Sequence, residues 1–472
     1  MRKAFLDREW YLKYSTVWLI VLTVVLFLVW LPVKLTLYPA AVLGDSNVML
    51  NQATGIIPLS NGHSVAYVLL LRVSLFLGHV AHLNINMILF LFAEIQSLVM
   101  AFVLAWFLLR LLRRAPLWLV GVALLFFMLE PVIPVYSITI HSDVAFMLAF
   151  LIFTVLLWEL VHAEKPPNLK RLFALGCVGV LLSLFRNQGI FSVILSLIVA
   201  AILVRAVRRN LLVVAAACAA IMFSLLLVVF PALHMSASVD ASFGIPIQQV
   251  ARVIAEGEQL TPQDQQVVNS IMPLQDWKKY YTPGLVDPLK WSPTFDTSYF
   301  THHVKSFLSV WFRELLRHPR IYARAWALQT EGFWNPLKSP PGQYAETHIV
   351  SNQYGIVRTN ILQKVTGINM ASALDTRRMP SWFVPPGVLT WLVVLVSLAV
   401  VVRKRTRLIV PLAPALSTLL IMFLATPIAY CLRYVMCLVL LLPLLAYLPF
   451  DTIDQGKKKR TEKTEVSSER LA

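Results

Sequence analysis

Charged side chains are scarce in this chain of 472 residues: they make up 14% of the sequence, whereas apolar residues make up 58%. Soluble globular proteins usually contain about 25% charged and about 45–50% apolar residues. The mean hydropathy is correspondingly high, at +0.71. This shortage of charge excludes an ordinary soluble protein, and the apolar excess indicates a polytopic membrane protein.

Cysteine is also scarce, because only Cys177, Cys218, Cys431 and Cys437 are present. All four lie in or beside apolar segments, and their spacing matches neither a zinc site nor a disulfide framework. We interpret them as packing residues.

Acidic residues are fewer than basic ones, 24 against 41, which gives a formal net charge of +17. The Lys and Arg residues stand in short clusters between apolar runs, where basic residues set membrane orientation. We therefore attribute the positive charge to topology and expect no nucleic-acid partner.

The apolar residues form about ten runs long enough for membrane helices, which need about 17–25 residues. The first run lacks the small-residue cleavage site of a signal peptide, so we interpret it as a spanning helix. The runs cover approximately residues 14–37, 83–109, 116–131, 143–162, 171–185, 189–204, 211–231, 384–402, 408–426 and 434–450.

Basic clusters alternate with the apolar runs in the way that the positive-inside rule requires. If the N-terminus with Arg2, Lys3 and Arg8 is cytoplasmic, every second connection is basic, and the C-terminus is cytoplasmic too. The clusters are Arg110/Arg113/Arg114, Lys165/Lys170/Arg171, Arg205/Arg208/Arg209, Arg403/Lys404/Arg405/Arg407 and Lys457 to Arg460.

This topology divides the chain into four parts and predicts an all-α fold. Residues 1–231 form an N-terminal membrane domain of about seven spans, with a first outer loop at 38–82. Residues 232–383 are rich in Pro, Trp, Tyr and charge, and we expect a mainly helical extracytoplasmic domain. Residues 384–450 are the C-terminal membrane helices, and 451–472 form a disordered basic cytoplasmic tail.

Local signals refine the two outer segments. Residues 65–80 are apolar but short and interrupted by Arg72, so we expect an interfacial helix in the first outer loop. In the larger segment, Thr261 with Asp264 is typical of a helix start, and Pro319 predicts a break between two helices.

The scarce polar residues of the apolar regions fall at the outer ends of the predicted helices. Ionisable residues at membrane depth are costly, and they usually face a cavity or a partner. We therefore expect a site for an anionic substrate with a general base. Its candidate members are Asp45, His63, Asp143, Arg186, Asn187, Arg433 and Tyr434.

Each ionisable candidate also has a purely structural explanation. Asp45 fits a solvated loop residue or a cap, Asp143 fits a helix cap, Arg186 fits an ion-pair partner of Asp143, and Arg433 fits a contact with headgroups. The histidines His63 and His141 fit hydrogen-bonded surface residues better than metal ligands. Glu94, inside the second run, fits a pairing with a neighbouring helix.

Several strings together resemble an uncharacterised bacterial membrane family, the domain of unknown function 6020, over about residues 40–450. They are Asp45 with SNGHS ending at Ser64, HSD ending at Asp143, RNQG from Arg186, IPIQQVARV from Ile245, YYTPGLVDPLK from Tyr280, and Arg433 with Tyr434. That family in turn is similar to the type C glycosyltransferases, which take a sugar from a polyprenyl-phosphate donor at the outer face of the membrane.

The resemblance implies that Asp45 is a general base or metal ligand and that Asp143 is a second catalytic acid. It further implies a multi-pass protein of the bacterial inner membrane, an extracytoplasmic active site, and a lipid or glycan acceptor. The relatives are expected to carry Lys before the second Asp, where this chain has Ser142. Phosphate contacts are therefore expected from Arg186 and Arg433.

The residue types suit this chemistry. A carboxylate can take the proton of an acceptor hydroxyl, and Arg can hold a leaving phosphate through two hydrogen bonds. A divalent cation such as Mg or Mn can share that phosphate, but Asp45 and Asp143 alone are a small ligand set, so the metal stays open.

Two other functions fit the composition. An envelope polysaccharide polymerase or ligase acting on lipid diphosphates predicts several outer arginines, such as Arg313, Arg317, Arg320 and Arg324, although their spacing also suits a solvated helix face. A lipid-linked oligosaccharide transporter predicts broken helices, charges near the bilayer midplane and an inverted repeat, which the sequence does not display.

Overall fold

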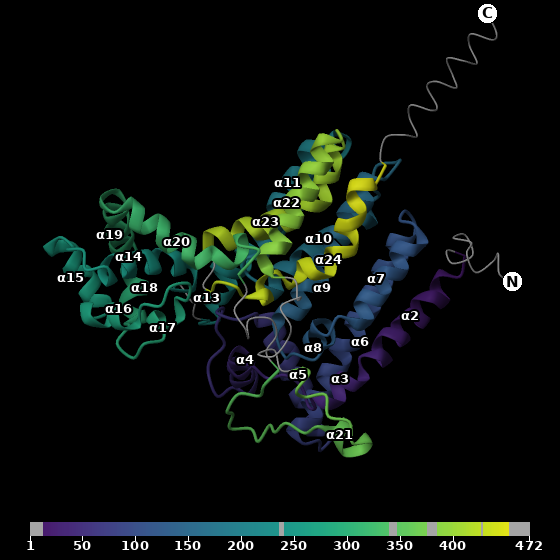
Figure 1. The fold of residues 1–472 in the computed structure, drawn as a ribbon, viewed down its shortest axis with the longest axis horizontal. Helices are drawn as coiled ribbons and strands as arrows, with labels where there is room; N and C mark the ends of the chain where they lie inside the picture. The colour runs from purple at the N-terminus through teal and green to yellow at the C-terminus, as the bar shows by residue number, and fades with distance from the viewer. Residues whose placement is uncertain (1–12, 236–239, 339–346, 375–384, 426–427, 453–472) are drawn as a thin grey trace, which may run out of the picture.

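A computed structural model describes residues 13–235, 240–338, 347–374, 385–425 and 428–452 (Figure 1). Within these ranges every regular element is a helix, and extended backbone pairs only in isolated bridges. The predicted all-α fold is confirmed. The predicted tail lies outside the described residues from residue 453 onward.

Six helical stretches of the described residues are long and apolar enough to cross a membrane, which supports a membrane-embedded protein. α2 and α3 together form the first stretch, and the last three stretches each include short turns of other helix types. The stretches are α2 (Ser15–Val29) with α3 (Leu31–Thr36), α6 (Ile85–Leu112), α9 (Ser142–Val161), α12 (Arg208–Ser224) with α13 (Phe230–Ala232), α23 (Ile409–Ala425) and α24 (Met436–Tyr447).

The other four predicted runs are also helical, but they are shorter, with 13 to 17 residues. At about 1.5 Å per residue they reach about 20–26 Å, less than the 30 Å hydrocarbon core. The count of ten spans therefore remains a prediction. These helices are α7 (Leu117–Leu129), α10 (Leu169–Phe185), α11 (Gly189–Leu203) and α22 (Pro386–Val402).

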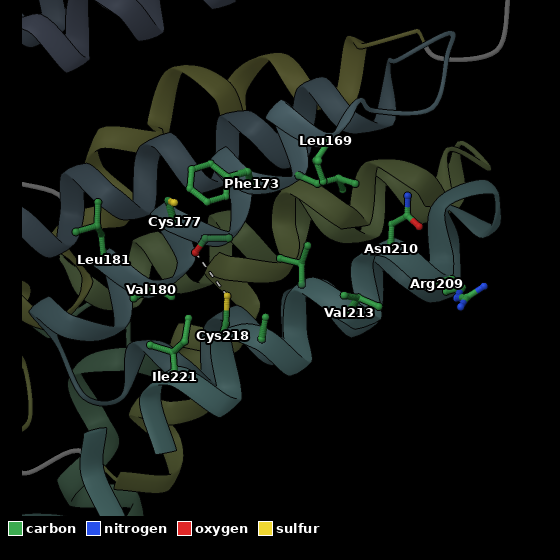
Figure 2. A pocket seen from close by; sticks show the side chains of 14 residues that line it. Leu169, Phe173, Cys177, Val180, Leu181, Arg209, Asn210, Val213, Cys218 and Ile221 are labelled. Atoms are coloured by element: carbon green, nitrogen blue, oxygen red, sulfur yellow. Dashed lines mark hydrogen bonds between the residues drawn. The ribbon is translucent and has the colours of Figure 1, made fainter. Parts of the chain in front are cut away.

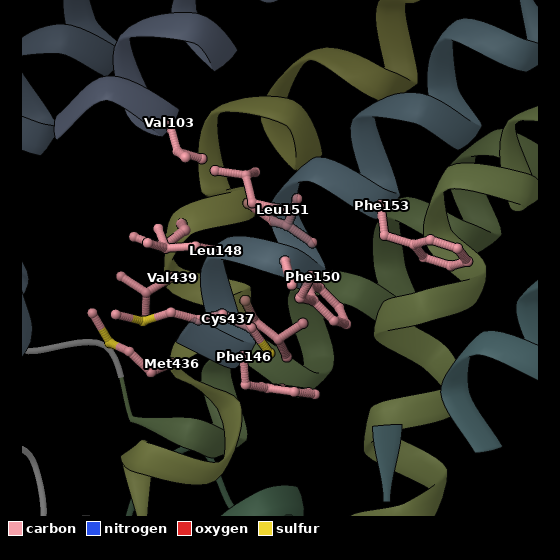
Figure 3. Close-up of a cluster of buried hydrophobic side chains, with 14 of the residues drawn as sticks. Val103, Phe146, Leu148, Phe150, Leu151, Phe153, Met436, Cys437 and Val439 are labelled. Atoms are coloured by element: carbon pink, nitrogen blue, oxygen red, sulfur yellow. The ribbon is translucent and has the colours of Figure 1, made fainter. Parts of the chain in front are cut away.

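Helix α9 runs through the core of the bundle (Figure 3). Its side chains are apolar all round, which is typical of a helix covered on every side. Phe150, Leu151 and Phe153 are fully buried. Val103 of α6 and Met436 of α24 belong to the same core, so α9 packs against helices from both the N-terminal and the C-terminal half of the chain.

Asp451, which follows α24, links several chain segments at one end of the bundle. Its carboxylate accepts a hydrogen bond from Trp158 Nε1 at 2.8 Å and lies 3.0 Å from His162 Nε2, both on the last turns of α9. Arg405 Nη1 donates to its backbone oxygen at 2.6 Å. The ends of α9 and α24 and the basic connection after α22 thus lie together, as the alternation of basic clusters predicts.

Two helices follow the first long stretch: α4 (Gly44–Thr54) and α5 (Val65–Val80). The Arg72 guanidinium turns back and donates to the Gln52 and Ala53 carbonyls at the end of α4, although the residue itself is exposed on α5. The interfacial position expected for residues 65–80 stays a prediction. The outward face of α5 is apolar: Leu69, Leu70, Val73, Phe76, Leu77 and Val80 are all exposed.

A second, separate hydrophobic core lies within residues 243–311. Thr261 caps α15 by accepting a hydrogen bond from the Asp264 amide, and α19 ends just before Pro319; both predictions are confirmed. The helices are α14 (Gly244–Ala255), α15 (Pro262–Ile271), α16 (Leu274–Tyr280), α17 (Asp287–Lys290), α18 (Thr297–His302), α19 (Val304–Arg317) and α20 (Pro319–Trp334).

The later described residues of this segment, 347–374, do not share this second core. Ile356 and Leu374, on either side of α21 (Ile361–Thr366), are buried in the core of the bundle. Val42 pairs with Ile349 through an isolated bridge. The predicted outer domain therefore consists of a helical unit with its own core and a later strap that packs on the bundle.

Gly332 on α20 lies against the backbone of Tyr430. A Cβ at position 332 would stand 2.2 Å from the Tyr430 nitrogen, and the Tyr430 hydroxyl already donates to Glu331. We expect Gly332→Ala to destabilise the protein by about 1–3 kcal/mol, because overpacking forces the backbone to move. The melting temperature of the detergent-purified protein measures this.

The matched control is Gly121→Ala on α7, where a Cβ meets nothing within 4 Å. Ala favours helix over Gly by about 1 kcal/mol, so this variant should melt no lower than the wild type. Equal melting temperatures for the two variants would contradict the close approach at Gly332.

Candidate functional site

A polar cavity of about 330 Å³ lies at the end of the bundle opposite Asp451, between α4, α9, α10 and the short 3-10 helix η6 (Leu432–Val435) that precedes α24. All seven residues predicted from the sequence line it, although they come from four separated parts of the chain. They are Asp45, His63, Asp143, Arg186, Asn187, Arg433 and Tyr434.

Backbone hydrogen bonds between loops bring the first acid to the second. The Ala41 amide donates to the Ile138 carbonyl at 3.2 Å, and the Ile140 amide donates to the Ala41 carbonyl at 3.0 Å. α4 then begins at once, because Ser46 Oγ accepts from the Leu43 amide at 2.9 Å. Asp45 in the first turn of α4 is thereby held beside His141.

Asp45 forms the tightest ion pair of the cavity. Its Oδ2 lies 2.8 Å from Arg433 Nη1 and 3.3 Å from His141 Nε2. Burial alone would raise the pKa of Asp45, but the hydrogen bond from His141 and the charge of Arg433 outweigh it and hold that pKa far below its ordinary value. Asp45 is therefore a carboxylate at any physiological pH.

Asp143 extends the same network. Its carboxylate lies 3.4 Å from Arg433 Nε and 3.6 Å from Arg186 Nη1. The cap of α9 is not Asp143 but His141, whose Nδ1 accepts from the Asp143 amide at 3.1 Å. Asp143 does form the ion pair with Arg186 that the structural explanation predicts. Both residues line the polar cavity, however, so the pair is part of the cavity wall.

Arg186 is positioned by the tight turn between α10 and α11. A side chain at Gly189 would meet the Leu182 carbonyl at 2.7 Å, so only glycine fits there. Asn187 Nδ2 donates to the Asn61 carbonyl at 2.9 Å, which ties this turn to the first outer loop. The Arg186 guanidinium lies over the Tyr434 ring at 4.9 Å, a cation–π contact that fixes its direction.

Arg433 does not reach outward to headgroups, because both of its acidic partners are inside the cavity. His63 faces the same space from the first outer loop. Burial lowers the pKa of His63, although Asp45 opposes this, so its imidazole is neutral near pH 7. A neutral imidazole offers one hydrogen-bond donor and one acceptor to a ligand.

Three charged or titratable residues of this cavity were not predicted from the sequence. His141 was interpreted as a surface residue, yet it is only 6% exposed and lies between the two acids. Asp287 and Lys290 line the cavity from α17 of the outer segment. Both residues belong to the string YYTPGLVDPLK, which has neither helical nor strand periodicity. This string was noted only because it contributes to the family resemblance.

The outer segment is held over the cavity by the loop that precedes Arg433. The Ala429 amide donates to the Gly284 carbonyl at 2.8 Å, next to an isolated bridge between Leu285 and Ile428. Gly284 adopts φ +79° and its Cβ position lies 3.3 Å from the Leu328 carbonyl, so glycine is required. Burial raises the pKa of Asp287, with Lys290 opposing the shift.

The acidic side chains of this cavity do not form a suitable set of ligands for a divalent cation. Asp45 and Asp143 each face a guanidinium, and Arg433 touches both. A bound cation would stand next to these positive groups. No cluster of three His, Cys, Asp or Glu side chains suited to a metal occurs in the described part of the chain.

A larger groove of about 800 Å³ lies between α10 and α12 (Figure 2). Its walls are apolar, with Phe173, Leu181 and Ile221 among them, and its polar side chains Arg209 and Asn210 lie at one end. It contains no carboxylate, so it lacks the groups that acid–base chemistry needs. The polar cavity is the candidate active site.

No curated protein and no solved structure matches the chain. The family of unknown function DUF6020 matches residues 54–467, a range that begins after Asp45 and includes the other six predicted site residues. Because the match covers most of the sequence, the chain belongs to the DUF6020 family.

Proposed function

We propose that this protein is a membrane glycosyltransferase that transfers a sugar from a polyprenyl-phosphate donor to a lipid or glycan acceptor. One observation carries the proposal: two carboxylates and two guanidinium groups from separate helices meet in one cavity at the end of an apolar bundle. Such a cavity offers cations to a phosphate and a base to a hydroxyl.

Arg186 and Arg433 are the proposed phosphate ligands. Arg binds phosphate through two parallel hydrogen bonds, and these strengthen as negative charge develops. During transfer the bond between the anomeric carbon and the phosphate oxygen breaks, and its electron pair stays on the phosphate. The phosphate charge grows from about −1 to about −2 in that step, so the two guanidinium groups stabilise the leaving group.

Asp45 is the proposed general base. With Arg433 bound to it, the carboxylate is a weak base, because its pKa lies far below the ordinary value. A donor phosphate competes with Asp45 for Arg433, and losing that partner raises the pKa of Asp45. The carboxylate can then accept the proton of the acceptor hydroxyl as its oxygen attacks the sugar. Donor binding thus switches on the base.

The charge balance of the cavity favours a donor with one phosphate. The charged side chains of its lining are Asp45, Asp143 and Asp287 against Arg186, Lys290 and Arg433, a net charge of zero while the histidines are neutral. A phosphodiester brings one negative charge, whereas a diphosphate brings at least two. This argues against the polymerase or ligase alternative that acts on lipid diphosphates.

The outer arginines do not restore that alternative. Arg313 pairs with Asp264 and Arg317 pairs with Glu314, within the helical unit. Neither Arg320 nor Arg324 lines the polar cavity. The oligosaccharide transporter remains the other candidate. Lys34 and Glu94 Oε2, 2.7 Å apart, form the buried pair that would serve it, and Glu94 Oε1 is buried without a hydrogen-bond partner among the described residues.

The orientation proposed for the protein has ten spans, cytoplasmic termini, and the cavity on the extracytoplasmic face of the bacterial inner membrane. Basic clusters at the Asp451 end support it, because cytoplasmic loops are enriched in Lys and Arg. The apolar outward face of α5 supports a helix lying at the outer interface beside the cavity.

We expect Asp45→Asn to reduce sugar transfer at least 100-fold, because the acceptor hydroxyl then lacks a proton acceptor. The measurement uses purified protein, a labelled polyprenyl-phosphate sugar and an acceptor lipid. Glu164→Gln, an exposed acid on the connection between α9 and α10, is the control and should leave the rate unchanged. Full activity in Asp45→Asn would remove Asp45 as the base.

We expect His141→Asn to move the acid limb of the pH profile of kcat to higher pH, because kcat reports the donor complex, in which the phosphate has taken Arg433 from Asp45. Asn still caps α9, but it removes the hydrogen bond that lowers the pKa of Asp45. A higher pKa means that the carboxylate is protonated earlier as the pH falls. A profile identical to that of the wild type would show that Asp45 does not set the acid limb.

We expect cysteines placed at Lys278 and Lys165, both exposed, to lie on opposite sides of the membrane. In a cysteine-free background, a membrane-impermeant maleimide should label position 278 on α16 in intact spheroplasts. Position 165 should react only after permeabilisation. Labelling of position 165 alone in intact spheroplasts would reverse the proposed orientation.

A further inference from the structure

Two groups of residues in the lining of the polar cavity differ in charge and exposure. The first group is charged or titratable and largely buried, with the side chains of His141, Asp143 and Arg433 only 8%, 9% and 18% exposed. We call it the floor: Asp45, His141, Asp143, Arg186 and Arg433. The second group carries no charge, and none of its members is buried. We call it the rim: Asn61, Gly62, His63, Ser242 and Trp291.

The polar side chains of the rim are available to a ligand. Within the described part of the chain, the side chains of Asn61, His63 and Ser242 form no hydrogen bond, whereas the floor residues bind one another. Amide, imidazole and hydroxyl groups each offer donors and acceptors. A ligand with several hydroxyl groups can therefore bind these three side chains without breaking an existing contact.

Trp291 adds a large apolar surface to the rim. It is 72% exposed, and its ring contacts no other aromatic ring and no cation among the described residues. Leu289, two positions earlier and on the other side of the turn, is fully buried in the core of the helical unit. The same core buries Trp277 completely, whereas Trp291 stays outside it and faces the cavity.

The rim thus combines a flat aromatic face with free polar groups. A six-membered sugar ring matches both surfaces, because its C–H groups form a flat apolar face and its hydroxyl groups surround the edge. The face of an aromatic ring carries partial negative charge, which attracts the slightly positive C–H groups. Binding sites for small molecules commonly pair an apolar surface with a few polar groups that fix the orientation.

The rim adjoins the floor at two points. Asn187, which follows Arg186 in sequence, donates to the Asn61 carbonyl at 2.9 Å. The turn at Gly284, just before α17, is hydrogen-bonded to the loop that precedes Arg433. Each part of the rim is therefore attached beside one of the two guanidinium groups. A sugar bonded to a phosphate at the floor lies between these two parts.

We propose that the rim binds the sugar of the lipid-linked donor, with Trp291 stacked on the ring and Asn61, His63 and Ser242 bound to its hydroxyl groups. This inference rests on the proposed function and adds the class of sugar to it. The sugar is an uncharged pyranose, because the rim offers no charged side chain to a carboxylate or an ammonium group.

The structural alternative is that Trp291 anchors the protein at the membrane interface, where Trp is enriched. An interfacial anchor contacts lipid whether or not the lipid carries a sugar. Stacking on the ring instead affects only the ligand that has one. A comparison of the same lipid phosphate with and without its sugar therefore separates the two explanations.

The test uses titration calorimetry in detergent with a short-chain polyprenyl phosphate and with the same lipid carrying glucose, mannose or galactose. Trp291→Ala should weaken binding of a glycosylated lipid roughly 10-fold, as expected for loss of one stacking contact. Its affinity for the lipid without sugar should stay within about twofold of the wild type, because the floor is unchanged. Trp291→Phe keeps an aromatic face and should restore most of the affinity.

Trp118→Ala is the matched control, since Trp118 on α7 is 69% exposed and does not line the cavity. It should bind every ligand as the wild type does. Asn61→Ala should weaken only the glycosylated lipid, by roughly 2- to 10-fold for one hydrogen bond. Melting temperatures show whether each variant is folded. If Trp291→Ala does not fold, Asn61→Ala decides: selective weakening supports the rim, and unchanged affinity overturns it.

Failure of this inference differs from failure of the proposed function. Wild-type protein that neither binds polyprenyl phosphate nor transfers sugar would overturn the function. If folded Trp291→Ala binds the glycosylated lipids as tightly as the wild type, or loses equal affinity for the lipid with and without sugar, only the sugar site at the rim is overturned. The same holds if the wild type binds polyprenyl phosphate but none of the three glycosylated lipids.

Discussion

The pairing of buried charges at the end of the bundle is the constraint on which the rest of the structure depends. A carboxylate or a guanidinium near the apolar region is costly unless it meets an opposite charge. Asp45, Asp143, Arg186 and Arg433 satisfy one another only when α4, α9, α10 and the start of α24 come together. The network therefore fixes the arrangement of these helices at one end, while the apolar contacts of α9 fix it along the bundle.

The loops around this network are held by few but specific contacts. Ala41 joins the first outer loop to the loop before α9, Asn187 joins that first loop to the turn after α10, and Gly284 joins the outer segment to the loop before Arg433. Each contact links two parts of the chain that are far apart in sequence. Together they surround the cavity with backbone that is already hydrogen-bonded, which leaves side chains to face a ligand.

Much of this site was predictable from sequence, because its members stand at the ends of apolar runs. Alternation of basic clusters sorts those ends into two groups, and Asp143, Arg186 and Arg433 fall into the same group as Asp45. Lys290 was not predictable, since its place over the cavity depends on the long-range pairing of Gly284 with Ala429. The hydrogen bonds of Arg72 were not predictable for a similar reason: no local pattern reveals that a side chain returns to the carbonyls of an earlier helix.

The charged side chains of the cavity neutralise one another, and this affects how strongly an anionic ligand can bind. Each cation of the site already has an acidic partner, so a phosphate gains affinity only by replacing that partner and not by filling an empty positive pocket. When phosphate replaces a carboxylate as the partner of a cation, that carboxylate loses its ion pair and is less stabilised. The free energy of phosphate binding must offset this loss. In the proposed transfer reaction, the carboxylate released in this way becomes a stronger base when the donor binds. Substrate binding and activation of the base would then be one event, which would keep the site unreactive toward water and hydroxyls in the absence of donor.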